Sequence, residues 1–228
     1  MRRILLLAHR VPVDGAFTLN DLAGGGGRMD EVARAVSTAF TLSNDLRRDV
    51  EMWVLFVAAP APRARRIRLV GDRLRRLNPD ERSTAALLKN ALVRSVALDR
   101  DVESSPGLVV GPVDPLAALK EFLAGPHPLW LEEGGGPIAA ALPGATDFSA
   151  VLSDPTDPAP AERAVLESAG VPRVSVGPRA LRASQCIDLL LAEFDRREPP
   201  IGPAGRPTPE GPARADGPDR GPPASTGT

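Results

Sequence analysis

The chain has 228 residues, 43% of them hydrophobic, which fits one folded domain, alone or with a short appendage. A single cysteine excludes an internal disulfide, and this cysteine and the two histidines have no metal-ligand spacing. A formal net charge of −1 does not by itself indicate nucleic-acid binding. No apolar run reaches the roughly eighteen residues of a membrane span, and residues 4–8 are too short for a signal peptide, so we expect a cytoplasmic protein without membrane segment or metal.

Strands and a helix are predicted to alternate at the start of the chain. Residues 4–8 form a short apolar run typical of a strand, and apolar residues recur at helical spacing over residues 28–43. Two further apolar runs predict strands at residues 50–58 and 67–70.

The next helix has a recognisable beginning. Asn78 is predicted to cap it, with Pro79 at the first helical position and Glu81 three residues after the cap, as in a capping box. We expect this helix to continue to about residue 98.

The second half of the chain repeats the alternation. Strands are predicted at residues 108–110, 129–131, 150–152 and 173–176. Helices are predicted at residues 115–123, 161–169 and 181–194. The pattern predicts an α/β fold with a mainly parallel sheet flanked by helices.

The C-terminal segment differs in composition from the rest. Residues 199–228 hold nine of the 25 prolines and six of the 21 glycines, with almost no apolar residue larger than alanine. Such a segment cannot bury enough surface to offset its ordering entropy, so we predict a disordered tail behind a domain of residues 1–198. Its three arginines are balanced by three acidic residues, so it is not an electrostatic RNA arm.

A basic segment lies between residues 63 and 76. It contains seven arginines against one acidic residue, Asp72. Such a stripe is able to pair with phosphates and to make binding salt-sensitive. The alternative is a solvated strand-and-turn face without a ligand. Since the chain has no tyrosine and few other aromatics, base stacking is not expected.

Charged and amide side chains cluster in the junction before residue 50. Residues 42–50 read L-S-N-D-L-R-R-D-V and connect a predicted amphipathic helix to a nearly continuous apolar strand. Charged side chains at the entrance of a buried strand are costly unless they are paired or used. We therefore place candidate functional residues here.

Four separated motifs resemble the TrmY family of tRNA methyltransferases in the SPOUT superfamily. They are G-R-M-D-E-V-A-R-A-V-S-T-A-F-T-L-S-N-D-L-R-R-D-V at residues 27–50, N-P-D-E-R-S at 78–83, S-P-G-L at 105–108 and V-S-V-G-P-R-A-L-R-A-S-Q-C-I at 174–187. The resemblance spans roughly residues 1–196. It implies a C-terminal trefoil knot, a homodimer, and S-adenosylmethionine-dependent methylation of N1 of pseudouridine at position 54 of tRNA.

Three predicted strands of the second half end in loops that suit a cofactor. Ligands of open α/β sheets collect outside the carboxyl ends of strands, and glycine or proline in the loops lets a ligand approach the main chain. With the resemblance, this predicts an S-adenosylmethionine site made by Leu131, Glu132, Leu152, Ser153, Asp154, Val176, Gly177, Pro178, Leu181 and Cys186. The alternative is a set of ordinary strand-to-helix turns.

The chain departs from the family pattern in these loops. It has Ser153 where members have Gly, Val-Gly-Pro-Arg at residues 176–179 where they have Leu-Ser-Pro-Leu, and Gln185 where they have His. A serine at a position that needs a positive φ would cost about 1 kcal/mol, so we expect an altered cofactor affinity. Cys186 is interpreted as a small residue packed against the cofactor, with covalent attack on the base as the alternative.

The proton on N1 of pseudouridine must be removed for methyl transfer. Asp49 and Asp30 are the candidate bases, and Arg48 is the candidate for stabilising negative charge on the base carbonyls or gripping a phosphate. The alternative is an Arg–Asp network that only locks the helix–strand junction. The candidate RNA-binding residues are Arg28, Arg47, Arg66, Arg68 and Arg82.

Three functions remain open from the sequence. The first is pseudouridine N1-methylation of tRNA, and the second is the same reaction on rRNA or another RNA. The third is a non-catalytic RNA-binding protein that keeps the fold without the donor site, which the altered residues Ser153 and Gly177 keep open.

Overall fold

The computed structural model describes residues 1–57 and 64–198; predictions for residues 58–63 and for the tail, residues 199–228, lie outside the described residues. The strands are β1 (Arg2–Ala8), β2 (Val50–Phe56), β3 (Ala64–Val70), β4 (Val102–Ser105), β5 (Leu108–Val113), β6 (Pro128–Pro137), β7 (Phe148–Ser153) and β8 (Arg173–Ser175). The helices are α1 (Met29–Phe40), α2 (Glu81–Ser95), α3 (Pro115–Leu123), α4 (Ile138–Ala141), α5 (Pro160–Ser168) and α6 (Ala183–Asp195).

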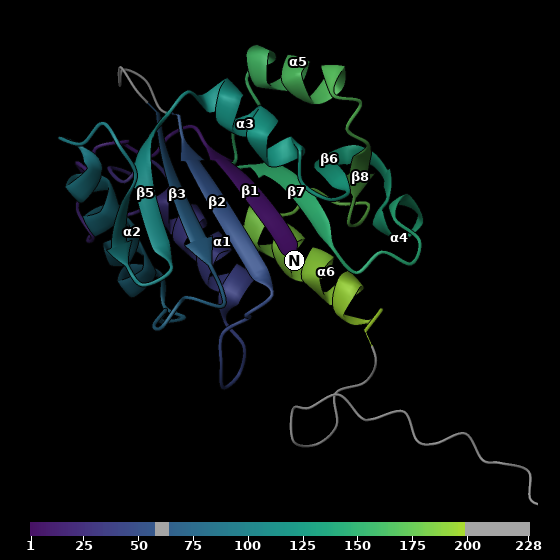
Figure 1. Ribbon diagram of the computed structural model, residues 1–228, viewed down its shortest axis with the longest axis horizontal. Coiled ribbons are helices and arrows are strands. Elements are labelled where there is room, and N and C mark those ends of the chain that lie inside the picture. Colours follow the sequence, from purple (N-terminus) through teal and green to yellow (C-terminus); the bar gives the residue numbers. More distant parts are fainter. Residues whose placement is uncertain (58–63, 199–228) are drawn as a thin grey trace, which may run out of the picture. The chain divides into compact units, whose positions relative to one another are not determined.

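The strands form a single sheet in the order β4-β5-β3-β2-β1-β7-β6-β8 (Figure 1). Strands β2, β1, β7, β6 and β8 pair in parallel, and β3, β5 and β4 extend the sheet by antiparallel pairing. The prediction of an α/β fold with a mainly parallel sheet is therefore confirmed. We call the two ends of the parallel strands the amino end and the carboxyl end of the sheet.

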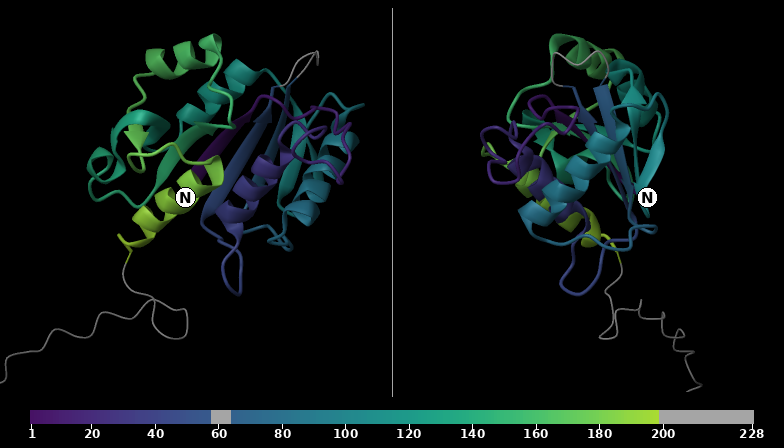
Figure 2. Two further views of the ribbon diagram at one scale, coloured as in Figure 1. Left: turned by 180° about the vertical axis from the view of Figure 1, so that it is seen from behind. Right: turned by 90° about the vertical axis from the view of Figure 1, so that its left-hand side faces the viewer.

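Helices cover both faces of the sheet. In Figures 1 and 2, α1, α2 and α6 lie on one face, and α3 and α5 lie on the other. Both faces of the sheet are apolar, as β1 illustrates, because alternate residues of a strand point to opposite faces. Ile4 and Leu6 belong to the core under α1, α2 and α6, whereas Leu5 and Leu7 belong to the core under α3 and α5.

A few boundaries differ from the predictions. The expected cap at Asn78 is wrong: α2 begins at Glu81, and the Oδ1 atom of Asp80 accepts a hydrogen bond from the Ser83 amide at 2.7 Å. The helix ends at Ser95, short of residue 98. Strand β4 and the short helix α4 were not predicted, whereas α3 has the predicted bounds.

The β1–β7 register sets up the functional geometry. Arg2 at the start of β1 is level with Val50 on β2 and with Phe148 on β7, and Leu7 is level with Ser153. Residues that follow β1, β6, β7 and β8 therefore meet at the carboxyl end of the sheet. The trefoil knot stays a prediction.

Candidate active site

A cavity of about 700 Å³ opens at the carboxyl end of the sheet, among residues of β6, the end of β7 and the loops that follow β7 and β8. It unites eight of the ten predicted cofactor residues: Leu131, Glu132, Leu152, Ser153, Asp154, Val176, Leu181 and Cys186. Gly177 and Pro178 belong to the same loop but are not among its lining residues. Three segments that are distant in sequence thus form one site.

The cavity has the size and lining of a small-molecule site. Cofactor pockets usually measure about 300–1,000 Å³ and combine apolar walls with a few polar groups. Leu131, Leu152 and Leu181 supply apolar walls. At Gly134, which also lines the cavity, a Cβ atom would have nothing within 4 Å, so a ligand has free access to the main chain there. These features fit a nucleoside cofactor such as S-adenosylmethionine.

One wall is polar and was only partly predicted. Glu132 pairs with Arg163 at 2.9 Å and with Arg173 at 3.2 Å. Both guanidinium groups stack on the ring of Trp130, at 4.9 and 4.8 Å from its centroid. Glu132 is therefore held in an ion-pair network. Trp130, Arg163 and Arg173 were not predicted, because neither the spacing nor the charge of their segments links them to Glu132.

The carboxylate of Asp154 is committed to neighbours in the chain. Its Oδ2 atom accepts a hydrogen bond from the His9 amide at 2.8 Å, and its Oδ1 atom accepts one from the Thr156 amide at 2.9 Å. Although burial raises the pKa of Asp154, hydrogen bonds from His9 and from these amides lower it below its ordinary value. Asp154 thus supports the cavity wall as a fixed anion.

His9 completes a buried cluster beside the cavity. Its Nδ1 atom lies 3.3 Å from Asp154 Oδ1, and its Nε2 atom lies 2.8 Å from Glu162 Oε2. Burial alone lowers the pKa of His9, but hydrogen bonds to both carboxylates outweigh it and raise the pKa to about 9. The imidazolium therefore ties the end of β1 to the loop and helix after β7. Sequence reasoning missed both His9 and Glu162.

The structure bears on two of the predicted cofactor residues, Ser153 and Cys186. Ser153 is the last residue of β7 and is not among the described residues with a positive φ, so the expected strain is not incurred. Cys186 is half-buried on α6, and burial, followed by the charge of Glu133, raises the pKa of its thiol. A raised pKa lowers the thiolate fraction, which argues against a nucleophile at Cys186.

The junction at residues 42–50 lies at the opposite, amino end of the sheet. Asp49 precedes β2 and is 3.4 Å from Arg2, and Arg47 donates to Asp195 at 2.6 and 3.0 Å. The seven-residue strand β1 separates the two ends by roughly 20 Å. Within one chain, Asp49 and Arg48 are therefore not brought together with the cavity.

Asp30 lies near the carboxyl end but is tightly paired. It accepts two hydrogen bonds of 3.0 Å from Arg28 and one of 2.9 Å from Arg34. Burial raises its pKa, but these two guanidinium groups outweigh burial and lower it. A base for this proton needs a raised pKa, so the pairing argues for a structural role of Asp30 and of Arg28.

The other predicted RNA-binding arginines also have partners in the chain. Arg66 bonds Asp101 at 3.0 Å and Glu121 at 3.2 Å, and Arg68 bonds Glu51 at 2.9 Å. Arg82 donates to Asn20 at 3.0 Å. Internal pairing lowers the charge that these groups offer to phosphates, so they are weaker candidates than the sequence indicated.

The described part of the chain has neither a cluster of metal-ligand side chains nor a membrane-spanning helix. Residues 1–57 and 64–198 contain no group of three or more His, Cys, Asp or Glu side chains placed to hold a metal ion. None of the helices in these ranges has the length and apolar character that crossing a bilayer requires.

The structure has an α/β fold with a mainly parallel sheet and a cavity at the carboxyl end of that sheet. Its fold is shared by Archaeoglobus fulgidus Nep1, solved with bound S-adenosylhomocysteine, at a TM-score of 0.60 and 15% identity, covering 86% of this chain and 97% of that one. The chain belongs to the SAM-dependent RNA methyltransferase family, whose model matches residues 1–198.

Three relatives carry the same specific name. The tRNA (pseudouridine(54)-N(1))-methyltransferase of Methanocella arvoryzae is 40% identical over 199 residues, which is 86% of this chain and all of the relative. The enzymes of the same name from Methanosarcina mazei and Haloferax volcanii are 38% and 37% identical, over 87% and 86% of this chain and 92% and 96% of theirs. The resemblance to the TrmY family is confirmed.

Proposed function

We propose that this protein methylates N1 of pseudouridine 54 in tRNA, with S-adenosylmethionine as the methyl donor. The observation that carries the proposal is the cavity of about 700 Å³ at the carboxyl end of the sheet, in a chain 40% identical to such an enzyme over that enzyme's full length. A cytoplasmic location belongs to the proposal, because tRNA is modified there.

The chain's own groups must bind the donor and orient the base. The bound donor supplies an electrophilic methyl group; the reaction forms the N1–C bond, breaks the C–S bond and releases the N1 proton. Leu131, Leu152 and Leu181 would hold the adenosine part, with main-chain groups of the three loops as hydrogen-bond partners. Such positioning supplies up to roughly 7–11 kcal/mol of barrier reduction in favourable cases.

A homodimer is part of the same proposal. Within one chain, Asp49 and Arg48 lie at the end of the sheet opposite to the cavity. A base role for Asp49 therefore requires that a second copy present its junction to this cavity. We propose that Asp49 of one subunit accepts the N1 proton at the cavity of the other, while Arg48 stabilises charge on the base carbonyls.

Mass spectrometry of nucleosides tests the function directly. Total tRNA and rRNA from cells with and without the gene are digested, and N1-methylpseudouridine is quantified in each pool. The proposal expects its loss from tRNA alone. Loss from rRNA alone would assign the enzyme to another substrate. If calorimetry detects no binding of S-adenosylmethionine at millimolar concentration, only a non-catalytic role remains.

A further inference from the structure

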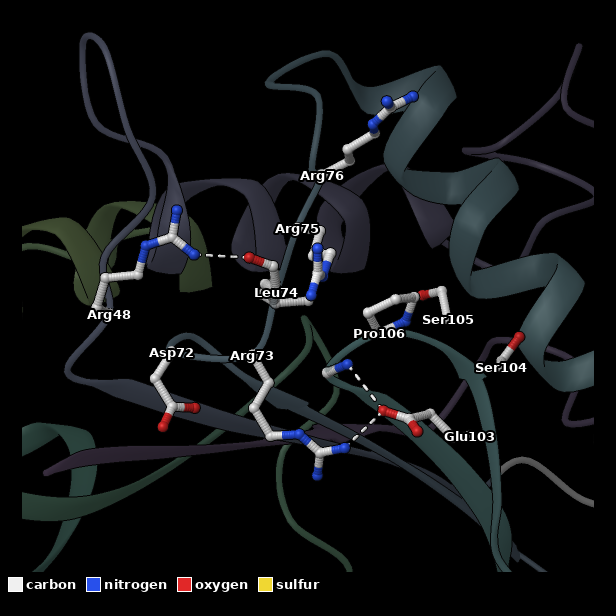
Figure 3. Close-up of a pocket in the computed structure, with 11 residues that line it drawn as sticks. Arg48, Asp72, Arg73, Leu74, Arg75, Arg76, Glu103, Ser104, Ser105 and Pro106 are labelled. Carbon is white, nitrogen blue, oxygen red and sulfur yellow. Dashed lines mark hydrogen bonds and ion pairs between the residues drawn. The ribbon is translucent and has the colours of Figure 1, made fainter.

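A second cavity, of about 1,100 Å³, lies at the amino end of the sheet. Figure 3 shows the residues that line it. It is formed by Arg48, the turn after β3 and the turn between β4 and β5. Its lining contains four arginines, Arg48, Arg73, Arg75 and Arg76, against two acidic residues, Asp72 and Glu103. The cavity is therefore basic in a chain whose overall charge is near zero.

The segment that carries these arginines is held rigidly. Leu74 and Leu77 are 1% and 9% exposed and anchor it in the core. Gly71 lets it pass close to the junction, since a Cβ atom there would meet the Arg47 carbonyl oxygen at 2.2 Å. Arg48 donates to the Leu74 carbonyl at 2.6 Å, the contact drawn at the left of Figure 3. The backbone between the anchors is thereby fixed, and Arg75 and Arg76 leave it on the exposed side.

Arg75 and Arg76 differ from the other arginines of the basic segment. Both are exposed, and neither takes part in a hydrogen bond or ion pair within the described ranges 1–57 and 64–198. Arg73, by contrast, pairs with Glu103 at 2.8 Å, as Figure 3 shows. An adjoining hollow of about 320 Å³ is lined by the same Arg48, Arg75 and Arg76 and by Asp45, which pairs with Arg48 at 2.7 Å. Two neighbouring hollows thus share three guanidinium groups.

We propose that this amino-end basic pocket, through Arg75 and Arg76, binds phosphate groups of the substrate RNA backbone. This inference rests on the proposed function. Guanidinium forks match phosphate oxygens and carry no sequence information, so the pocket positions the RNA. The only apolar side chains in its lining are Leu74 and Pro106, which disfavours a protein partner, and no aromatic side chain is present for base stacking.

Charge reversal of the two unpaired arginines tests the pocket. Arg75→Glu/Arg76→Glu is compared with Arg100→Glu/Lys120→Glu, an equal change of charge at two exposed residues that lack a partner within the described part of the chain and lie outside both cavities. Fluorescence anisotropy measures tRNA binding at several salt concentrations. Calorimetry with S-adenosylmethionine and the melting temperature report on the donor site and the fold.

We expect the pocket variant to bind tRNA roughly ten- to a hundredfold more weakly, with a salt slope lower by about two. The KM for tRNA should rise while kcat at saturating tRNA, the affinity for S-adenosylmethionine and the melting temperature stay near wild type. The control variant should bind tRNA nearly as wild type does.

Three results would overturn the proposal that the pocket binds RNA. They are an unchanged tRNA affinity and salt slope, an equal loss of tRNA affinity in the control variant, or a fall of kcat without a rise in KM. If the charge reversal prevents folding, the neutral pair Arg75→Gln/Arg76→Gln is judged by the same criteria. Since binding is measured without turnover, an inactive wild-type enzyme that binds tRNA through the pocket would refute the proposed reaction and leave the pocket standing.

Discussion

His9 and Asp154 join the carboxyl ends of β1 and β7 across 145 residues of sequence, through both the amide and the ring of the histidine. Glu162 at the start of α5 holds the other ring nitrogen at 2.8 Å. A charged imidazole donates from both nitrogens, whereas a neutral one donates from only one. The protonated ring therefore satisfies both carboxylates at once and fixes the loop that forms one wall of the proposed donor site.

This cluster predicts a pH-dependent stability. The pKa of His9 is raised from 6.5 to about 9 in the folded protein, so its contribution is fully present below pH 6.5 and is lost as the pH rises through about 9. His9→Gln should lower the melting temperature at pH 6.5, and the difference from wild type should shrink by pH 9.5. Thermal denaturation over this pH range measures the effect.

The second histidine supplies a matched control for His9. His127 pairs with Asp147 at 2.9 Å, but on an exposed surface outside the cavity. His127→Gln should change the melting temperature by much less at every pH. A constant gap between wild type and His9→Gln from pH 6.5 to 9.5 would contradict the charged cluster, as would an equal effect of both substitutions.

Asp49→Asn should abolish turnover and leave S-adenosylmethionine binding unchanged. The amide cannot accept the N1 proton, but its shape preserves the junction, and the donor cavity lies at the other end of the sheet. Single-turnover assays and calorimetry measure the two quantities. Asp99→Asn, at an exposed residue, is the control. Equal loss of both functions with a lower melting temperature would assign Asp49 a structural role.

Mixed dimers test whether Asp49 acts across the subunit interface. Asp49→Asn is co-expressed with Gly134→Trp, which adds a bulky side chain to the lining of the donor cavity and should block it. No atom lies within 4 Å of a Cβ placed there, so the fold should tolerate the change. Random pairing leaves one intact site in half of the dimers, so about a quarter of wild-type activity should return. Activity no higher than that of either inactive parent would rule out the shared site.

Local signals in the sequence were sufficient for most elements. Helix α3 has its predicted bounds because Pro115 stands at its first turn and Asp114 accepts a hydrogen bond from the Ala117 amide at 2.7 Å. At α2 two residues able to cap a helix, Asn78 and Asp80, flank a proline, and only the structure shows which one caps. The four-residue edge strand β4 carries no strong apolar alternation.

The sequence predicted which segments form the candidate site, but it did not predict which charged side chains pair there. The carboxyl-end rule finds Leu131, Leu152 and Val176, because each lies in or just after a predicted strand. The same rule would have drawn attention to His9, which follows β1. Its partner Glu162 is 153 residues away on a helix, and no local pattern records such a pairing. Likewise, the arginine stripe did not reveal which guanidinium groups are neutralised by distant acids.

Ser153→Gly, which restores the residue typical of the family, should not strengthen cofactor binding. Ser153 already has an ordinary backbone conformation at the end of β7, so glycine relieves no strain. Glycine in a strand is destabilising by roughly 0.5–1 kcal/mol, and the melting temperature should fall slightly. Calorimetry should give an affinity for S-adenosylmethionine within about threefold of wild type. A clear gain in affinity would show that the serine side chain impedes the donor.

Cys186→Ala should retain turnover. The raised pKa of the thiol leaves little thiolate near neutral pH, and the Sγ atom lies 3.9 Å from the Leu181 carbonyl oxygen, inside the loop that walls the cavity. Removing this small, half-buried thiol should weaken S-adenosylmethionine binding by no more than about tenfold and leave kcat nearly unchanged. Denaturing gels of wild-type enzyme with tRNA should show no covalent adduct. An adduct that disappears in the alanine variant, together with loss of turnover, would establish Cys186 as a nucleophile.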